Sequence, residues 1–159
     1  EVDTVKFLVT VDREVEFNFK FRIPSWEKKN LIVKINGEDI LLSKKANEWG
    51  SISRIWKNGD IITITFPFEL YFVPVDKKNV NIAALCYGPI VLACDEMAIL
   101  KGDINNPQEW IEKIDENDMV FKTKKGHDLG YDFIRRTFKP FYKIGEMEWY
   151  YLYNRIVEE

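Results

Sequence analysis

Three pairs of neighbouring carboxylates have the spacing that acid–base hydrolysis could use. They are Glu14 and Glu16, Asp95 and Glu96, and Glu146 and Glu148. Two carboxylates at positions i and i+2 of a strand share one face and lie roughly 7 Å apart, a separation compatible with two-carboxylate hydrolysis of a glycoside. The chain contains 26 acidic residues, however, so such pairs also arise by chance. A stand-alone enzyme that uses paired carboxylates is therefore the least favoured of the functions considered.

The histidine and the cysteines do not form a recognisable metal or nucleophile motif. His127 is the only histidine and has just Asp128 beside it, whereas a structural zinc site needs four ligands. Cys86 and Cys94 lie in apolar sequence, and no histidine nearby in the sequence could activate either thiol. We expect an ordinary loop histidine and two buried free thiols, with a disulfide between the cysteines as the open alternative. No catalytic residue, metal ligand or cofactor is predicted in this chain.

Three tryptophans and two arginines are the candidate binding residues. Trp26, Trp49 and Trp56 lie near the ends of predicted strands, where an exposed indole ring could stack on a sugar. Packing in the core or docking against another domain is the alternative, and we favour it for each of them. Arg22 and Arg54 could form an ion pair or a hydrogen-bond fork at an interdomain contact, or could lie on a solvated strand face.

The composition excludes some classes of partner. The net charge is −3 and no cluster of lysine and arginine is present, so we expect no nucleic-acid partner. No apolar run reaches the roughly 18 residues that a membrane-spanning helix needs, so we expect no membrane partner. Aromatic residues make up 14% of the chain, which favours β structure.

The pattern of apolar residues predicts an all-β protein. Apolar side chains alternate over 5–11 and again over 15–21, the period of a half-buried strand, and Pro24 ends the second strand. Asn36-Gly37 indicates a tight hairpin, and Trp49 to Trp56 reads as a further strand. We predict an antiparallel β-sandwich of jelly-roll type over residues 1–100. Residues 101–159 are predicted to form a smaller β-rich or α+β extension, either separate or packed on the same sandwich.

The second half of the chain carries three further signals. An apolar run from Val80 to Cys94 is interrupted only at Tyr87-Gly88-Pro89, and we predict one central strand, buried on both faces and kinked or bulged there. Pro107 opens a short predicted helix with Asn106 as its N-cap. Two aromatic segments, Phe138 to Ile144 and Trp149 to Tyr153, close the chain.

Several ordered motifs carry a resemblance to a known family. They are Phe21-Arg22-Ile23-Pro24-Ser25-Trp26, Val33-Lys34-Ile35-Asn36-Gly37-Glu38, Ile52-Ser53-Arg54-Ile55-Trp56-Lys57-Asn58-Gly59-Asp60, Ala84-Leu85-Cys86-Tyr87-Gly88-Pro89-Ile90-Val91-Leu92-Ala93, and the two closing aromatic segments. In this order and spacing the chain resembles the β-sandwich region that follows the catalytic barrel in glycoside hydrolase family 127, the β-L-arabinofuranosidase-like enzymes.

The resemblance implies that the chemistry lies outside this chain. Family members place catalysis in an α/α barrel, where cysteine thiolates and a glutamate bind zinc and one cysteine attacks the sugar. Those residues belong to a Glu-x-Cys element and a Cys-Cys pair, and this sequence has neither, since Cys86 stands in Leu-Cys-Tyr and Cys94 in Ala-Cys-Asp. No catalytic residue of the family can be carried over to a position here.

The favoured function is therefore that of a non-catalytic accessory module that supports the catalytic barrel of the same polypeptide. The opening Glu1-Val2-Asp3-Thr4 leads directly into a strand pattern, which suggests a piece of a longer protein. The alternative is a carbohydrate-binding module that holds a glycan with exposed aromatic rings, so carbohydrate is the second possible partner.

Overall fold

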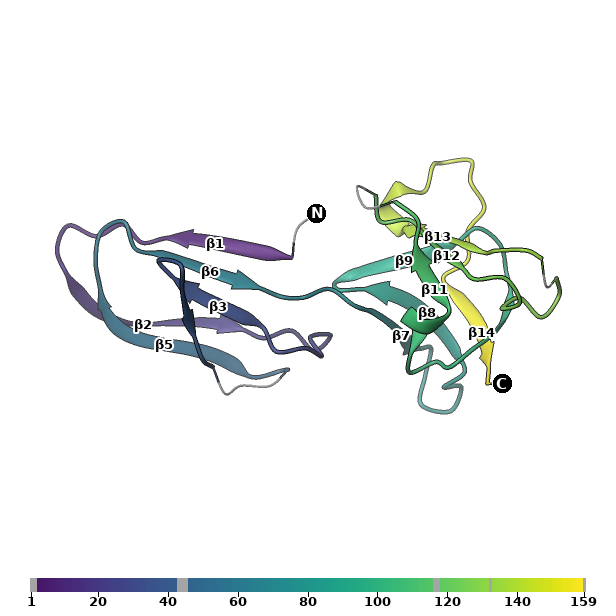
Figure 1. The fold of residues 1–159 in the computed structure, drawn as a ribbon, viewed down its shortest axis with the longest axis horizontal. Helices are drawn as coiled ribbons and strands as arrows, with labels where there is room; N and C mark the ends of the chain where they lie inside the picture. The colour runs from purple at the N-terminus through teal and green to yellow at the C-terminus, as the bar shows by residue number, and fades with distance from the viewer. Residues whose placement is uncertain (1–2, 43–45, 116–117, 132, 159) are drawn as a thin grey trace. The chain divides into compact units, whose positions relative to one another are not determined.

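The computed structural model describes residues 3–42, 46–115, 118–131 and 133–158. The described chain consists of β-strands and two short 3₁₀ helices, so the all-β prediction is confirmed (Figure 1). Its contacts divide it into two compact units, Glu1–Phe68 and Glu69–Glu159. The jelly-roll order of the strands stays a prediction.

The first unit is a sandwich of two antiparallel sheets. One sheet has the order β1 (Thr4–Leu8), β6 (Ile61–Thr65), β3 (Ile32–Ile35) and β4 (Glu38–Ile40), and the other pairs β2 (Val15–Arg22) with β5 (Trp49–Trp56). Apolar side chains of both sheets fill the space between them, among them the fully buried Trp56 and Ile62 together with Ile23, Val33 and Ile64. The alternation seen in the sequence thus becomes a buried inner face and a solvated outer face.

Two Asn-Gly turns connect the strands of this unit in different ways. At the first, Asn36 has φ 51° and Gly37 has φ 90°, the left-handed conformations that a tight β3–β4 hairpin requires. The second turn, with Gly59 at φ 89°, leads from β5 in one sheet to β6 in the other. Backbone hydrogen bonds fix this crossing, because Gly59 N–H donates to the Val9 carbonyl and Val9 N–H to the Asp60 carbonyl.

The register between β2 and β5 decides which residues face the core. Phe19 lies opposite Ile52, and Val15 lies opposite Trp56, on the inner face. Phe21 lies opposite Gly50, where an added Cβ would come within 2.3 Å of the Phe21 ring. Glycine at position 50 therefore makes room for the phenylalanine that closes this end of the core.

The second unit is built on one large, mostly antiparallel sheet. Along the sheet the order is β10 (Ile99–Lys101), β14 (Tyr153–Val157), β8 (Ile82–Tyr87), β9 (Ile90–Cys94), β13 (Thr137–Pro140), β12 (Phe121–Thr123) and β11 (Ile111–Lys113), and β7 (Leu70–Pro74) also pairs with β8. The 3₁₀ helices are η1 (Pro107–Glu109) and η2 (Phe141–Lys143). The β10–β14 pair is parallel. The centre of the sheet is buried at β8 and β9, where Leu85, Leu92 and Cys94 have no exposed surface.

The single kinked strand predicted over 80–94 is wrong, because the run forms a hairpin of β8 and β9. Tyr87 pairs with Ile90 across Gly88 and Pro89, and Gly88 has φ 55°. A glycine with positive φ suits the first position of a two-residue hairpin turn, and Pro89 has no N–H to leave unpaired. The apolar run is continuous because both strands are central, with partners on each side.

Two local predictions need smaller corrections. A short helix does begin at Pro107, but it is a 3₁₀ helix, and the Asn106 side chain makes no capping hydrogen bond. The Asn106 amide donates to the Asp103 carboxylate instead. The last strand runs from Tyr153 to Val157, later than the predicted aromatic segment that starts at Trp149.

The division of the chain falls at residue 68, whereas the sequence prediction placed a boundary after residue 100. Strands on either side of residue 100 pair with each other, since β8 pairs with β14 and β9 with β13. Most of the predicted extension, 101–159, is therefore built into the same sheet as β7, β8 and β9. No change of composition marks residue 68 in the sequence.

Replacing Trp56 with alanine tests the core of the first unit. Trp56→Ala removes the largest fully buried side chain, and the free energy of unfolding should fall by about 3–5 kcal/mol. Trp49→Ala is the matched control on the outer face, with 60% of the side chain exposed, and should change stability by no more than about 0.5 kcal/mol. Urea unfolding followed by circular dichroism measures both, and comparable losses would contradict the assignment of faces.

Candidate functional site

Trp56 belongs to the core and not to a surface. Its indole N–H donates to the Phe17 carbonyl at 3.0 Å, and its ring stacks on the Phe17 ring with centroids 5.3 Å apart. Because Trp56 has no exposed surface, its ring is not accessible to a sugar. The core alternative stated for Trp56 is the one that the geometry fits.

Arg54 lies on the inner face, over Trp56. Its guanidinium carbon is 5.3 Å from the Trp56 ring centroid, and one guanidinium nitrogen lies 4.0 Å from a carboxylate oxygen of Asp60. Asp60 also accepts hydrogen bonds from the Asn36 amide at 2.8 Å and the Lys57 N–H at 2.9 Å. Both hydrogen bonds lower the pKa of Asp60, and the one from Asn36 has the larger effect. These partners all belong to the first unit, where they join the two Asn-Gly turns.

Trp26 is half-buried at the end of the first unit. Its ring meets Phe66 and Phe68 edge-on, with centroids 6.1 Å and 5.6 Å away. Edge-to-face packing of this kind stabilises an aromatic cluster. Only part of the Trp26 ring surface is left for contact with another molecule.

Arg22 and Trp49 are brought together on the outer face. The β2–β5 register places the two residues directly opposite each other, and Trp49 is 60% exposed. Side chains in such cross-strand pairs have Cβ atoms about 4.5–5.5 Å apart. We call this outer face of β2 and β5 the Arg22–Trp49 face, and its members are Glu16, Asn18, Lys20, Arg22, Trp49, Ser51, Ser53 and Ile55.

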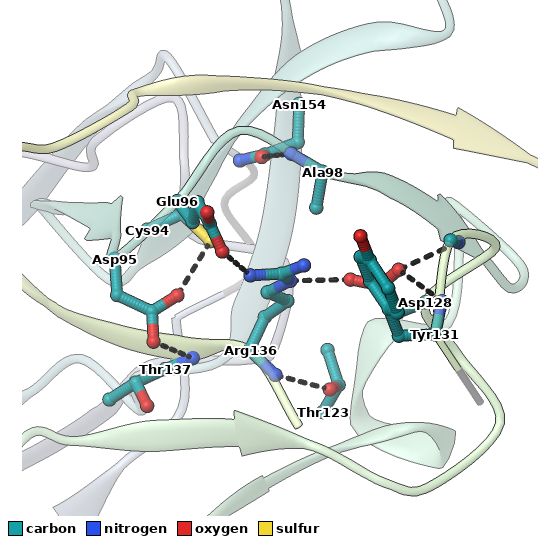
Figure 2. Close-up of polar contacts among 11 residues, drawn as sticks. Cys94, Asp95, Glu96, Ala98, Thr123, Asp128, Tyr131, Arg136, Thr137 and Asn154 are labelled. Carbon is teal, nitrogen blue, oxygen red and sulfur yellow. Dashed lines mark hydrogen bonds and ion pairs between the residues drawn. The ribbon is translucent and has the colours of Figure 1, made fainter. Parts of the chain in front are cut away.

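A buried arginine organises the polar contacts of the second unit (Figure 2). Arg136 donates hydrogen bonds to the carboxylates of Asp128 and Glu96, and its backbone N–H donates to the Thr123 hydroxyl at 2.9 Å. The side chains of Arg136 and Asp128 are 7% and 3% exposed, whereas that of Glu96 is 67% exposed. Burial lowers the pKa of Arg136, but the hydrogen bonds with Asp128 and Glu96 outweigh it and the pKa is raised.

Asp128 in turn holds the loop that follows it. One carboxylate oxygen accepts the N–H groups of Gly130 and Tyr131, at 2.8 Å and 3.1 Å, as Figure 2 shows. The Arg136–Asp128 pair therefore connects this loop to the start of β13, which is a structural role. Arg136 was not among the residues predicted from the sequence. The turn signal Asp128-Leu129-Gly130 was present, but nothing in it identifies the arginine as a partner.

His127 is held in a stack of rings. Its Nδ1 lies 2.5 Å from the Lys101 carbonyl, and its ring stacks on Trp110 with centroids 5.6 Å apart. Trp110 stacks in turn on Phe72, at 5.8 Å. Among the described residues, no group of three or more histidine, cysteine, aspartate or glutamate side chains could hold a metal ion.

Four carboxylates of the three candidate pairs, those of Glu14, Asp95, Glu96 and Glu148, have separate partners. Glu14 pairs with Lys57 at 3.1 Å, and Glu96 pairs with Arg136 while Asp95 accepts the Thr137 N–H. The Glu148 carboxylate accepts from Lys139, and this bond lowers the pKa of Glu148. A general acid needs a raised pKa, so Glu148 is shifted in the opposite direction.

Both cysteines are free and buried, as expected. Burial raises the pKa of Cys94 to about 12 and also raises the pKa of Cys86. The thiolate is the reactive form of cysteine, so neither thiol is suited to act as a nucleophile near neutral pH.

An exposed aromatic segment was not selected from the sequence. Trp149 is 86% exposed and Met147 is 94% exposed, and Tyr142 and Tyr150 are also exposed nearby in the sequence. The aromatic run from Trp149 to Tyr153 was noted, but alternation alone does not tell an exposed ring from a core ring. In the part of the chain that the structure describes, no helix is long and apolar enough to cross a membrane.

The fold is found in parts of known glycoside hydrolases. A GH127 beta-L-arabinofuranosidase from Geobacillus stearothermophilus T6 has a TM-score of 0.70 and 20% identity, over 98% of this chain and 29% of that chain. A GH127 beta-arabinofuranosidase has a TM-score of 0.69 and 18% identity, over 98% of this chain and 30% of that chain. A protein described as a glycoside hydrolase has a TM-score of 0.66 and 14% identity, with the same coverage. The chain spans about three-tenths of these proteins.

The first unit also matches a family model. Residues 1–68 match the family model described as "Beta-L-arabinofuranosidase, GH127 middle domain". The match ends at the residue where the first compact unit also ends. The resemblance to family 127 that the motifs indicated is therefore confirmed, and the matched part is the middle domain. No curated protein matches the sequence.

The thiols provide a test of the buried centre of the second unit. Cys86 and Cys94 should not react with Ellman's reagent at mildly alkaline pH in the folded chain, and both should react in guanidinium chloride. Since the folded pKa of Cys94 is above its ordinary value of 9.0, the stability linked to this thiol is lost as the pH rises toward about 12. Rapid labelling of Cys94 in the folded protein would contradict this interpretation.

Removing one partner of the buried arginine tests the polar network. Asp128→Asn leaves Arg136 buried without its principal counter-charge and should lower the free energy of unfolding by about 3–5 kcal/mol. Glu96→Gln removes the exposed partner and should cost at most about 1 kcal/mol. Chemical denaturation of both variants provides the comparison, and equal losses would show that Asp128 is not the principal partner.

Proposed function

We propose that this chain is a non-catalytic accessory module of a family 127-like glycoside hydrolase, and that it supports a catalytic α/α barrel in the same polypeptide. The observation that carries the proposal is the match of residues 1–68 to the family's middle domain. The share of the neighbours' length that the chain spans supports it too, because about seven-tenths of each neighbour lies outside the matched region.

The chemistry of the described residues agrees with a supporting role. The thiols are buried with raised pKa values, and the carboxylates of Glu14, Asp95, Glu96 and Glu148 each pair with a separate basic or backbone group. A catalytic constellation would instead bring titratable groups together in a cleft with pKa values suited to proton transfer. The arabinofuranosidase activity of the neighbours would thus belong to the barrel and not to this module.

The Arg22–Trp49 face is the surface that we propose contacts the barrel. Of the five residues selected from the sequence, Arg22 and Trp49 are the two that lie exposed and opposite each other. Tryptophan and arginine are the residue types that most often anchor protein interfaces, since one supplies a large apolar surface and the other a fork of N–H donors. Ser51 and Asn18, joined by a 2.7 Å hydrogen bond, provide a flat polar surround.

The first test is the gene in which the chain is encoded. We expect an in-frame segment upstream of the Glu1 codon that encodes a helical region with a Glu-x-Cys element and a Cys-Cys pair. A start codon directly before Glu1 would overturn the proposal.

The second test uses that barrel together with this chain. The 159-residue chain alone should release no p-nitrophenol from p-nitrophenyl β-L-arabinofuranoside, and it should raise the melting temperature of the separately produced barrel. Trp49→Ala combined with Arg22→Ala should abolish most of this stabilisation, whereas Trp149→Ala, an exposed tryptophan of the second unit, should leave it unchanged. The proposal would be contradicted if the chain alone hydrolysed the substrate, or if the chain left the melting temperature of the barrel unchanged.

A further inference from the structure

A hollow beside Trp149 in the second unit has the chemistry of a sugar site. Its volume is about 390 Å³, within the range of small-molecule pockets. Two cross-strand neighbours, Ala93 on β9 and Lys139 on β13, line it together with Asp95 and Thr137. Ile144, Glu148 and Trp149, from the segment that follows η2, line it as well. We call this hollow the Trp149 groove.

The segment that carries Glu148 and Trp149 is fixed in place by backbone hydrogen bonds and by an ion pair. Cys94 and Tyr151 exchange two backbone hydrogen bonds, of 2.8 Å and 3.0 Å, which attach the segment after Trp149 to β9. The Glu148 carboxylate accepts the Gly145 N–H at 2.8 Å and pairs with the Lys139 ammonium at 2.7 Å. The groove is thus organised before any ligand arrives, which lowers the entropic cost of binding.

The polar groups around the exposed indole retain hydrogen-bonding capacity. An ammonium has three N–H donors, and the bonds from Lys139 to the two oxygens of Glu148, at 2.9 Å and 2.7 Å, use two of them. A carboxylate offers about four acceptor positions, so Glu148 and Asp95 can each accept further bonds. Sugar hydroxyls both donate and accept, while the C–H face of a sugar ring packs on an aromatic ring.

We infer that the Trp149 groove binds a neutral saccharide, with one sugar ring stacked on the Trp149 indole and its hydroxyls bonded to Asp95, Lys139 and Glu148. The charges select the class of ligand, because two carboxylates oppose one ammonium and so disfavour an acidic sugar. The 86% exposure of Trp149 leaves the ring open to the ligand in this chain. The inference does not rest on the accessory role, since the groove lies within the second unit.

The experiment is an NMR titration of the ¹⁵N-labelled 159-residue chain, which resolves the indole N–H signals of its five tryptophans. The ligands are L-arabinose, D-xylose, D-galactose, cellobiose and xylobiose, with D-galacturonate as the acidic counterpart of galactose. We expect at least one neutral sugar to shift the Trp149 signal saturably, with a millimolar Kd. Galacturonate should bind more weakly than galactose, and the difference should shrink as salt is added.

The variants separate the groove from the other exposed tryptophan. Trp149→Ala should raise Kd at least about tenfold, which corresponds to about 1.4 kcal/mol, whereas Trp149→Phe should retain part of the affinity and Trp49→Ala all of it. Lys139→Met should weaken binding without unfolding the chain, which circular dichroism verifies. Trp149→Phe keeps the test decisive if Trp149→Ala disturbs the fold.

Three outcomes would overturn the inference. The first is that no neutral sugar shifts the Trp149 signal saturably. The second is that binding persists unchanged in both Trp149 variants. The third is that Trp149→Ala abolishes association with the barrel while no sugar binds, which would make the groove a protein interface.

Discussion

The register between β2 and β5 determines both the core and the surface of the first unit. With Val15 opposite Trp56 and Phe21 opposite Gly50, the aromatic side chains of β2 face inward. The same register places Arg22 and Trp49 side by side on the outside. A slip of one residue would exchange the two faces and expose the core. The Arg22–Trp49 face and the hydrophobic core of this unit therefore both depend on one strand pairing.

In the second unit, a buried ion pair holds separate segments of the chain together. Arg136 and Asp128 are only eight positions apart, but their pairing joins the loop after Asp128 to β13, and Glu96 adds the turn that follows β9. A buried arginine requires its acceptors, so these three segments depend on one another. The Trp149 groove is built on the ends of the same two strands, with Asp95 and Thr137 as immediate neighbours of Glu96 and Arg136.

Local patterns predicted the strands well where one face of the strand is buried and the other is exposed to solvent. Alternation identified β1 and β2, and Asn36-Gly37 identified the β3–β4 hairpin, because each signal is contained within a few residues. The β8–β9 hairpin was missed because most residues of both strands are apolar and buried, and the exposed Val91 is apolar too, so the run has no period. The pairing of Arg22 with Trp49 and the Arg136 network depend on register and on loop closure, which no single segment encodes. The exposure of Trp149 also depends on register and on loop closure.

The position of β14 in its sheet determines the order in which the two units can fold during synthesis. The first unit is complete once Phe68 has been made, since every strand of its sandwich precedes that residue. In the second unit the last strand to be synthesised, Tyr153–Val157, lies between β8 and β10. During synthesis, one edge of β8 and one edge of β10 therefore stay unpaired until β14 is made, about fifty residues after β10 is complete. The ribosome adds about 5–20 residues per second. The first unit can already be folded during that interval. The sheet of the second unit is completed only when β14 has been made.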